Sequence, residues 1–169
     1  RYNYDVFFNG SAWPEHRLKI ISQIKEAKEI SFFGGLFNRD DLKFNCVVPD
    51  ELFHRKMNPS DYQYALNSSR IGLNIRGNGE NCYRQYEILS LGSFLLTQKT
   101  KTCWGHKEPQ HDQHALFFDT DTNDIIDIIK SSLADNQKMS TIRERGSKFY
   151  RDNLHPRCLA EYILDTIIS

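Results

Sequence analysis

The chain has 169 residues and carries 22 lysines and arginines against 22 aspartates and glutamates, so its formal charge is zero. This length is typical of one domain with a substantial core, and the balanced charge excludes a bulk electrostatic attraction to nucleic acid or to an anionic membrane. No apolar run approaches the roughly 18 residues of a membrane span, and the sequence shows no signal peptide. Four scattered cysteines without a CxxC pair are typical of free intracellular thiols, so we expect a cytoplasmic protein. Because the chain begins at Arg1 rather than Met, we also expect one domain excised from a larger protein.

The first part of the chain alternates expected strands and helices. Residues 4–10, YDVFFNG, form an aromatic and β-branched run that stops at an Asn-Gly turn, which predicts a strand. Residues 13–29 have a proline at a plausible first helical position and apolar residues on one face, which predicts a helix. Residues 29–35, EISFFGG, predict a second short strand. The stretch that follows predicts only one edge strand, around residues 44–48.

The middle of the chain continues the same alternation. Residues 58–69 predict a helix that begins at its Pro or Ser, and residues 70–77, RIGLNIRG, predict a buried strand. A glycine turn then leads into a helix over residues 80–91. A small-Gly-small turn and the apolar run FLLT at residues 94–97 predict the next strand.

The last third predicts one strand and three helices. Residues 98–114 form a loop rich in Lys, His and Gln, and residues 115–119, ALFFD, predict a strand. Residues 122–135 predict a helix that is capped by its first Thr or Asn. Two further helices, over residues 136–154 and 156–168, close the chain.

Short strands that alternate with helices of about ten residues or more predict a parallel sheet with helices on both faces. We therefore expect an α/β, Rossmann-like domain over residues 1–169 that ends in a helical tail. Ligands of such sheets bind outside the carboxyl ends of the strands. This rule gathers four segments around one crevice: residues 9–11, 34–35, 76–82 and the loop after Thr97.

The glycine turn before the helix over residues 80–91 predicts an anion site. Gly77 and Gly79 let the backbone turn sharply and approach a ligand closely. We expect the helix to begin near Glu80 or Asn81 and to point its free N–H groups and its positive dipole end into the crevice.

Three charged side chains accompany this helix start. Arg76 and Arg84 can donate hydrogen bonds to phosphate oxygens. Glu87 follows Arg84 by one turn and projects from a similar face, where a carboxylate suits the hydroxyls of a ribose. The pattern favours a nucleoside-diphosphate site without a Walker-type GKS or a GxGxxG fingerprint. The spacing alone equally allows an Arg84–Glu87 ion pair on a solvated helix face.

Two stretches, YQYALNSSRIGLNIRGNGENCYRQYEILSLGSFLLT and ALFFDTDTNDIIDIIKSSLADNQKMSTIRERGSKFYRDN, resemble the nucleotide-sugar-binding half of GT-B glycosyltransferases, in the group-1 and spore-maturation-like branch. There a strand ends in a small-residue loop, an Arg and a Glu follow on the next helix, and a small-Gly-small turn leads into another strand. The resemblance covers about residues 62–153. It implies transfer of a hexosyl group from a nucleoside-diphosphate sugar, with a UDP-sugar as the expected donor, to a hydroxyl of a glycan, protein or small molecule. It implies no metal or other cofactor.

The resemblance also implies which residues bind the donor. Glu87 matches the family carboxylate that holds the donor ribose, and Arg84 with the backbone of residues 81–83 matches the diphosphate-binding helix start. The loop after the first strand, together with Arg17, matches a loop that faces the phosphates in relatives. The base is expected near residues 33–36 and 57–59. The expected donor-binding residues are Asn9, Gly10, Ser11, Arg17, Arg76, Gly77, Gly79, Asn81, Cys82, Tyr83, Arg84 and Glu87.

A GT-B enzyme has two Rossmann domains, and the acceptor and often the catalytic base belong to the other one. This chain holds one, so we expect a second domain in the full-length protein or a shortened variant. The alternative from another class is a non-catalytic nucleotide- or partner-binding domain of the same fold. A receiver-like signalling domain ranks last, because FFNGS at the end of the first strand lacks an acidic cluster.

The sequence does not single out a catalytic base. Asp5 precedes an aromatic strand and His16 lies at a helix start, and either could act as a general base. For each of the two, the pattern favours a structural role. His106 or His111, in the long loop, could instead reach the donor sugar.

Two patterns would suit a metal. Asp119 and Asp121 form a DTD sequence like the DxD metal motif of the GT-A fold, although such residues also end strands and cap helices. A C-x2-H and H-x2-H series in the long loop would suit zinc, although a polar loop also collects histidines by chance. The series consists of Cys103, His106, His111 and His114. We expect no metal site.

Overall fold

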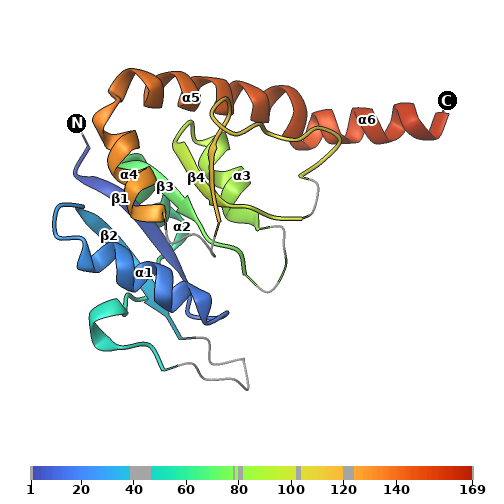
Figure 1. Ribbon diagram of the computed structural model, residues 1–169. Coiled ribbons are helices and arrows are strands. Elements are labelled where there is room, and N and C mark those ends of the chain that lie inside the picture. The colour runs from blue at the N-terminus through green and yellow to red at the C-terminus, as the bar shows by residue number, and fades with distance from the viewer. Residues whose placement is uncertain are drawn as a thin grey trace.

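The computed structural model describes residues 2–38, 47–77, 79, 82–101, 104–119 and 124–168. Its centre is a five-stranded sheet in the order β2-β1-β3-β4-β5, and every neighbouring pair of strands is parallel (Figure 1). This confirms the predicted α/β, Rossmann-like architecture. The strands are β1 (Tyr4–Ser11), β2 (Phe32–Phe37), β3 (Ser69–Asn74), β4 (Phe94–Gln98) and β5 (Leu116–Phe118).

Helices cover both faces of the sheet (Figure 1). They are α1 (His16–Glu26), α2 (Pro59–Asn67), α3 (Tyr83–Ser90), α4 (Ile125–Ala134), α5 (Asn136–Phe149) and α6 (Pro156–Ile168). A 3-10 turn (Asp50–Leu52) precedes α2, and a π-helical turn (Tyr150–Leu154) joins α5 to α6.

The alternation of side chains along β1 divides the core in two. Val6 and Phe8 face α1 and α4, whose isoleucines Ile21 and Ile129 are fully buried against that side. Phe7 points to the opposite face and packs with residues of α2 and α3. Each face of the sheet therefore has its own apolar layer.

α5 joins the two layers at one end of the sheet. Met139 and Ile142 from its first half belong to the α1–α4 layer, and Phe149 at its end belongs to the α2–α3 layer. α6 then projects away from the sheet, and none of its residues is buried (Figure 1). This confirms the predicted helical tail. Among the described residues, none of the helices combines the length and the apolar composition that crossing a bilayer requires.

Some predicted boundaries differ from the structure. α3 begins at Tyr83, later than the predicted start near Glu80 or Asn81, because Cys82 still has extended backbone angles. Both predicted start residues lie outside the described part of the chain, as do both candidate caps of α4. The predicted edge strand around residues 44–48 is wrong in its described part, since residues 47–48 belong to no strand.

Substitution of Gly34 by alanine should lower the free energy of unfolding by about 2 kcal/mol. Gly34 has φ +101°, and a Cβ there would lie 2.0 Å from the carbonyl oxygen of Phe8 in the neighbouring strand. Gly92 is the matched control, because it also has a positive φ, but a Cβ there would meet only the Ser147 hydroxyl, at 3.8 Å. Urea denaturation should show a loss of about 1 kcal/mol for Gly92→Ala. Equal losses for the two variants would contradict the predicted clash.

Candidate functional site

A cavity of about 480 Å³ opens between α2 and α3, beside the carboxyl ends of β1 and β2. Ligands of parallel α/β sheets bind at this edge, so the cavity lies where the topology predicts a site. Its walls come from both strands, from the segment before α2 and from the two helices. The lining residues are Asn9, Phe37, Lys56, Met57, Pro59, Tyr62, Gln63, Arg84, Glu87, Ser90 and Leu91.

Arg84 of α3 extends into this cavity from one side. Its Nη2 donates a hydrogen bond of 2.7 Å to the carbonyl oxygen of Asn9, and its Cζ lies 4.5 Å from the ring centroid of Phe8. Gly10 makes room for this arrangement, because a Cβ there would lie 2.7 Å from the Phe8 ring and 3.0 Å from Nη2. The other two guanidinium nitrogens, Nε and Nη1, are buried and have no hydrogen-bond partner in the part of the chain that the structure describes.

Glu87 lines the same cavity one turn further along α3, with an exposed side chain. It could have neutralised Arg84 on the helix surface, but none of the ion pairs of the described residues joins Glu87 to Arg84. The alternative of a solvated Arg84–Glu87 pair is therefore wrong. A cationic and an anionic side chain instead line one cavity.

Tyr62 of α2 is a cavity residue that the sequence analysis did not select. Its ring packs edge-on against Phe7, with 5.2 Å between the centroids. Its hydroxyl is buried without a hydrogen-bond partner among the described residues. Burial raises the pKa of Tyr62 to about 12, while the nearby charge of Arg84 acts in the opposite direction. The hydroxyl is therefore protonated at neutral pH and can donate a hydrogen bond.

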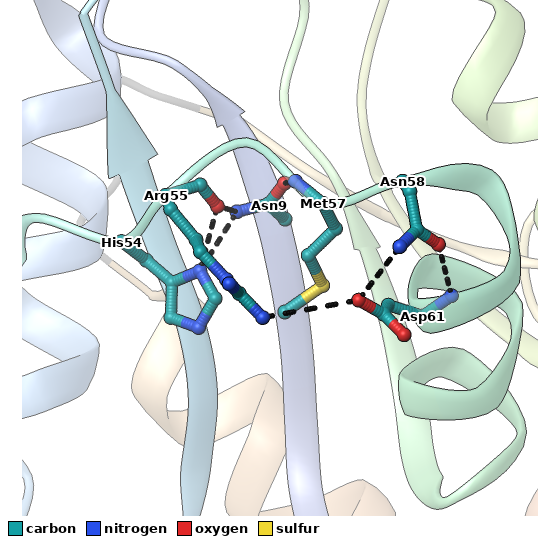
Figure 2. A network of polar contacts seen from close by, with 6 residues as sticks. All are labelled: Asn9, His54, Arg55, Met57, Asn58 and Asp61. Carbon is teal, nitrogen blue, oxygen red and sulfur yellow. Dashed lines mark hydrogen bonds and ion pairs between the residues drawn. The ribbon is translucent and has the colours of Figure 1, made fainter.

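The side chain of Asn9 forms part of the cavity wall by holding the segment before α2 (Figure 2). Its Nδ2 donates to the carbonyl oxygen of Arg55 at 3.1 Å and lies 3.3 Å from Nδ1 of His54, while its Oδ1 accepts from the backbone N–H of Met57 at 3.1 Å. We expected Asn9 to face a phosphate, but these contacts use its amide within the protein. Its function in the structure is to fix the wall that carries Met57.

The guanidinium of Arg17 also forms its hydrogen bonds within the protein. Its buried guanidinium donates to the carbonyl oxygens of Ser11, Trp13, Ile75 and Arg76 and to the Ser11 hydroxyl, at distances between 2.8 and 3.2 Å. Burial and the nearby Arg84 lower the pKa of Arg17 to about 10, so the group is still charged at neutral pH. Arg17 thus links the segments that follow β1 and β3, and its contact with a ligand phosphate stays a prediction.

Replacement of Arg17 by methionine should lower the free energy of unfolding by about 2 kcal/mol, because the buried carbonyls lose a charged donor while the packing volume is largely kept. Arg55→Met is the matched control, since the Arg55 side chain is 81% exposed and lies 3.9 Å from Asp61. A surface pair of that kind contributes less than about 1 kcal/mol. Urea denaturation of both variants tests the prediction, which fails if Arg17→Met unfolds like the control.

The remaining expected donor-binding residues lie beside the cavity rather than in its walls. A Cβ on Gly77 would lie 3.2 Å from Nη2 of Arg17, and the backbone N–H of Arg76 donates to Oε1 of Gln98 at 3.1 Å. Asn81 lies outside the described residues. The expected residues that the structure describes but that do not line this cavity are Gly10, Ser11, Arg17, Arg76, Gly77, Gly79, Cys82 and Tyr83. Among the described residues, the cavity therefore runs along the side of α3, from Arg84 in its first turn to Leu91 at its end.

The model of a glycosyl transferase-like family matches residues 4–165, from β1 into α6. The chain belongs to this glycosyl transferase-like family. No curated protein matches the chain closely enough to count as a relative. The family match confirms the resemblance to glycosyltransferases, while membership of the spore-maturation-like branch remains a prediction.

The catalytic-base candidates of this glycosyltransferase domain do not line the cavity. Asp5 lies at the amino end of β1, where it accepts from the backbone N–H of Ser31 at 3.0 Å and lies 3.6 Å from Arg70. His16 begins α1 and is half-buried. His106 stacks on Tyr162 of α6, with 4.5 Å between the centroids.

The other histidines of the long loop also have structural contacts in this glycosyltransferase domain. Nδ1 of His111 accepts from the backbone N–H of Phe117 at 3.0 Å, and Nδ1 of His114 accepts from that of Gln110 at 3.0 Å. Within the described ranges, no three His, Cys, Asp or Glu side chains are grouped as metal ligands would be. Cys103 and Asp121, which belong to the two candidate metal motifs, lie outside those ranges.

Acidification below pH 6.5 should lower the free energy of unfolding, partly through His16 and His114. Burial lowers the pKa of both side chains below the ordinary 6.5, helped by nearby arginines: Arg76 and Arg17 for His16, and Arg145 for His114. The unfolded chain therefore binds protons at these sites before the folded protein does, so stability is lost as pH falls from 6.5 toward the folded pKa values. Urea denaturation between pH 7.5 and 5 should give a shallower pH dependence for His114→Gln than for the unsubstituted chain. If the free energy of unfolding of His114→Gln depended on pH as steeply as that of the unsubstituted chain, the contribution of His114 would be contradicted.

A buried polar group holds α3 against the sheet. Asn74, at the end of β3, donates from Nδ2 to Oγ1 of Thr97 at 2.9 Å and to Oε1 of Gln85 at 3.3 Å. All three residues are completely buried. In the sequence, this cluster is indicated by a polar residue within or after an apolar run, Asn74 in GLNI and Thr97 in LLTQ. These bonds fix the first turn of the helix that carries Arg84.

Proposed function

We propose that the chain is the donor-binding domain of a GT-B-type glycosyltransferase, with the nucleoside-diphosphate part of the donor in the cavity between α2 and α3. The observation that carries this proposal is the guanidinium of Arg84, which lies in the cavity with two buried, unpartnered nitrogens. Buried donor groups that lack an acceptor are costly, and phosphate oxygens are the acceptors that guanidinium groups match best. Glu87, on the same wall, accepts hydrogen bonds from the ribose hydroxyls.

The reaction that we propose moves a glycosyl group to an acceptor hydroxyl. The bond between the anomeric carbon and the diphosphate oxygen breaks, and the diphosphate leaves with the electron pair. The acceptor oxygen forms the new bond to the anomeric carbon, and its proton passes to a base. Arg84 stabilises the negative charge of the leaving diphosphate without a metal ion. We had also expected Arg76 to contact the diphosphate, but it does not line the cavity.

The apolar part of the cavity suits a nucleobase. Phe37, Met57, Pro59 and Leu91 contribute to its lining, and a volume of about 480 Å³ is in the range of small-molecule sites. Residues 57–59 belong to the stretches that we expected to contact the base. In the other expected stretch, Phe33 stacks on Tyr4 at 4.4 Å and packs inside the domain. We propose UDP as the nucleotide.

The acceptor site and the catalytic base are proposed to come from a second domain. Asp5, His16 and His106 are all absent from the lining of this cavity, so the described residues offer no base from that set. The same observation favours a second candidate function, in which the domain binds a nucleotide without catalysing transfer.

Calorimetric titration with UDP, GDP, ADP and dTDP, each with and without Mn²⁺, tests donor binding. We expect one of the four to bind in the micromolar to millimolar range that is common for enzyme substrates, equally well without the metal. Binding that requires Mn²⁺ would contradict the proposal and would favour the Asp119–Asp121 motif. Binding of none would also contradict it.

Turnover by the full-length protein distinguishes the two candidate functions. The sugar donor of the preferred nucleotide is incubated with the protein, and release of the nucleoside diphosphate is measured with and without simple glycoside acceptors. Release above the rate of the Arg84→Ala variant is the result expected for a transferase. Tight binding without release would favour the non-catalytic candidate.

A further inference from the structure

The hydroxyl of Tyr62 is the second polar group in the cavity without a partner. It is buried, and no described residue lies at good hydrogen-bond geometry to it, although the guanidinium of Arg84 is close enough to oppose the rise of its pKa. Buried tyrosine hydroxyls ordinarily have a hydrogen-bond partner, so an orphaned one at the wall of a cavity indicates a group that is supplied from outside the chain.

The ring below this hydroxyl is held in place. It packs edge-to-face with Phe7, with 5.2 Å between the centroids and an interplanar angle of 65°. α2 itself is fixed at its start by Asn58, whose Oδ1 accepts from the backbone N–H of Asp61 at 2.8 Å (Figure 2). The hydroxyl is therefore presented to the cavity by a rigid support and does not depend on a mobile side chain.

Arg84 faces the same cavity from the opposite helix and is held equally well. The Asn9 carbonyl uses one of its nitrogens and the Phe8 ring supports its plane, while Nε and Nη1 have no hydrogen-bond partner among the described residues. A guanidinium offers donors only, and a protonated tyrosine hydroxyl supplies one more. The group that satisfies both sides at once is an anion with several acceptor oxygens.

We propose that Tyr62 is a phosphate ligand, which donates its hydroxyl to a non-bridging oxygen of the diphosphate that Arg84 also contacts. The inference rests on the proposed function, since it assigns a further residue to the same donor site. It places the phosphate in the space between α2 and the first turn of α3.

Tyr62→Phe tests this inference, because it removes only the hydroxyl and keeps the ring on Phe7. The probes are UDP, inorganic pyrophosphate and uridine, in calorimetric titrations. The variant should bind UDP and pyrophosphate about tenfold more weakly and uridine equally well, as expected for the loss of one hydrogen bond to a charged group. Tyr64→Phe, on the same helix with a side chain that is 70% exposed, is the matched control and should change none of the three affinities.

The outcomes separate the inference from the proposed function. If the unsubstituted chain binds UDP and pyrophosphate but Tyr62→Phe binds them equally well, only the role of Tyr62 is overturned. If the unsubstituted chain binds neither probe, the proposed function fails and the inference fails with it.

A double-variant cycle tests whether Tyr62 contacts the phosphate or only positions Arg84. In the Arg84→Ala background, a direct ligand still contributes, so Tyr62→Phe should weaken pyrophosphate binding further by several-fold. No additional loss in that background would overturn the direct contact.

Discussion

The Arg84→Ala variant should bind UDP about 100-fold more weakly than the unsubstituted chain, a difference of about 2.8 kcal/mol. Arg84 lines the cavity with a positively charged side chain, two of whose nitrogens have no hydrogen-bond partner in the described part of the chain. Each hydrogen bond to a charged group contributes about 1.5 to 3 kcal/mol, so the loss of two such contacts to the diphosphate accounts for the expected change. Uridine, which carries no phosphate, should lose little affinity.

Two further variants test whether the loss of affinity comes from the guanidinium contact with the phosphate. Arg84→Lys keeps the charge but not the planar guanidinium, so it should recover only part of the affinity for UDP. Arg55→Ala removes an exposed arginine from the segment before α2 and should leave the affinity unchanged. Equal losses for UDP and uridine in Arg84→Ala would show that the variant damages the cavity in general, and would contradict a phosphate contact.

The Glu87→Ala variant should also bind UDP about 100-fold more weakly, because an anionic acceptor loses hydrogen bonds to two ribose hydroxyls. The ratio of the affinities for UDP and 2′-deoxy-UDP is the more specific measurement. The unsubstituted chain should bind UDP about tenfold better than 2′-deoxy-UDP, whereas Glu87→Ala should bind the two equally.

Glu87→Gln serves as the matched control for this prediction. It keeps an acceptor oxygen at the same position without the charge, so its preference for UDP over 2′-deoxy-UDP should be intermediate. A ribose preference that survives in Glu87→Ala would contradict the assignment of Glu87 to the ribose.

The sequence predicted the architecture because each element carries its own local signal. β1 could be predicted from its aromatic and β-branched run, and α2 from the proline at its start. Arg84 and Glu87 could also be predicted as a pair, because positions three apart on a helix lie on neighbouring faces whatever the tertiary structure is.

The environments of Asn9 and Arg17 could not be predicted in the same way. A polar residue after a strand can face a ligand or can hold a loop, and the sequence pattern is the same for both roles. The partners of Asn9 are about 45 positions away along the chain, and two of the carbonyls that Arg17 binds are almost 60 positions away. Only the folded chain brings these groups together.

Tyr62 was missed for the opposite reason. On α2 it precedes the buried Ala65 and Leu66, so the sequence predicts that its ring packs on a buried helix face. This prediction is correct for the ring, which contacts Phe7, but it does not concern the hydroxyl of the side chain. The position of the cavity between α2 and α3 could not be predicted for the same reason, because it depends on how the two helices pack on the sheet.

A crystal structure of the chain with UDP and Mn²⁺ tests the central claim most directly. The account predicts the diphosphate within hydrogen-bonding distance of Arg84, the ribose hydroxyls at Glu87, and no Mn²⁺ between the phosphates and Asp119. Nucleotide bound outside the space between α2 and α3, or a diphosphate held through Mn²⁺ at Asp119, would contradict it.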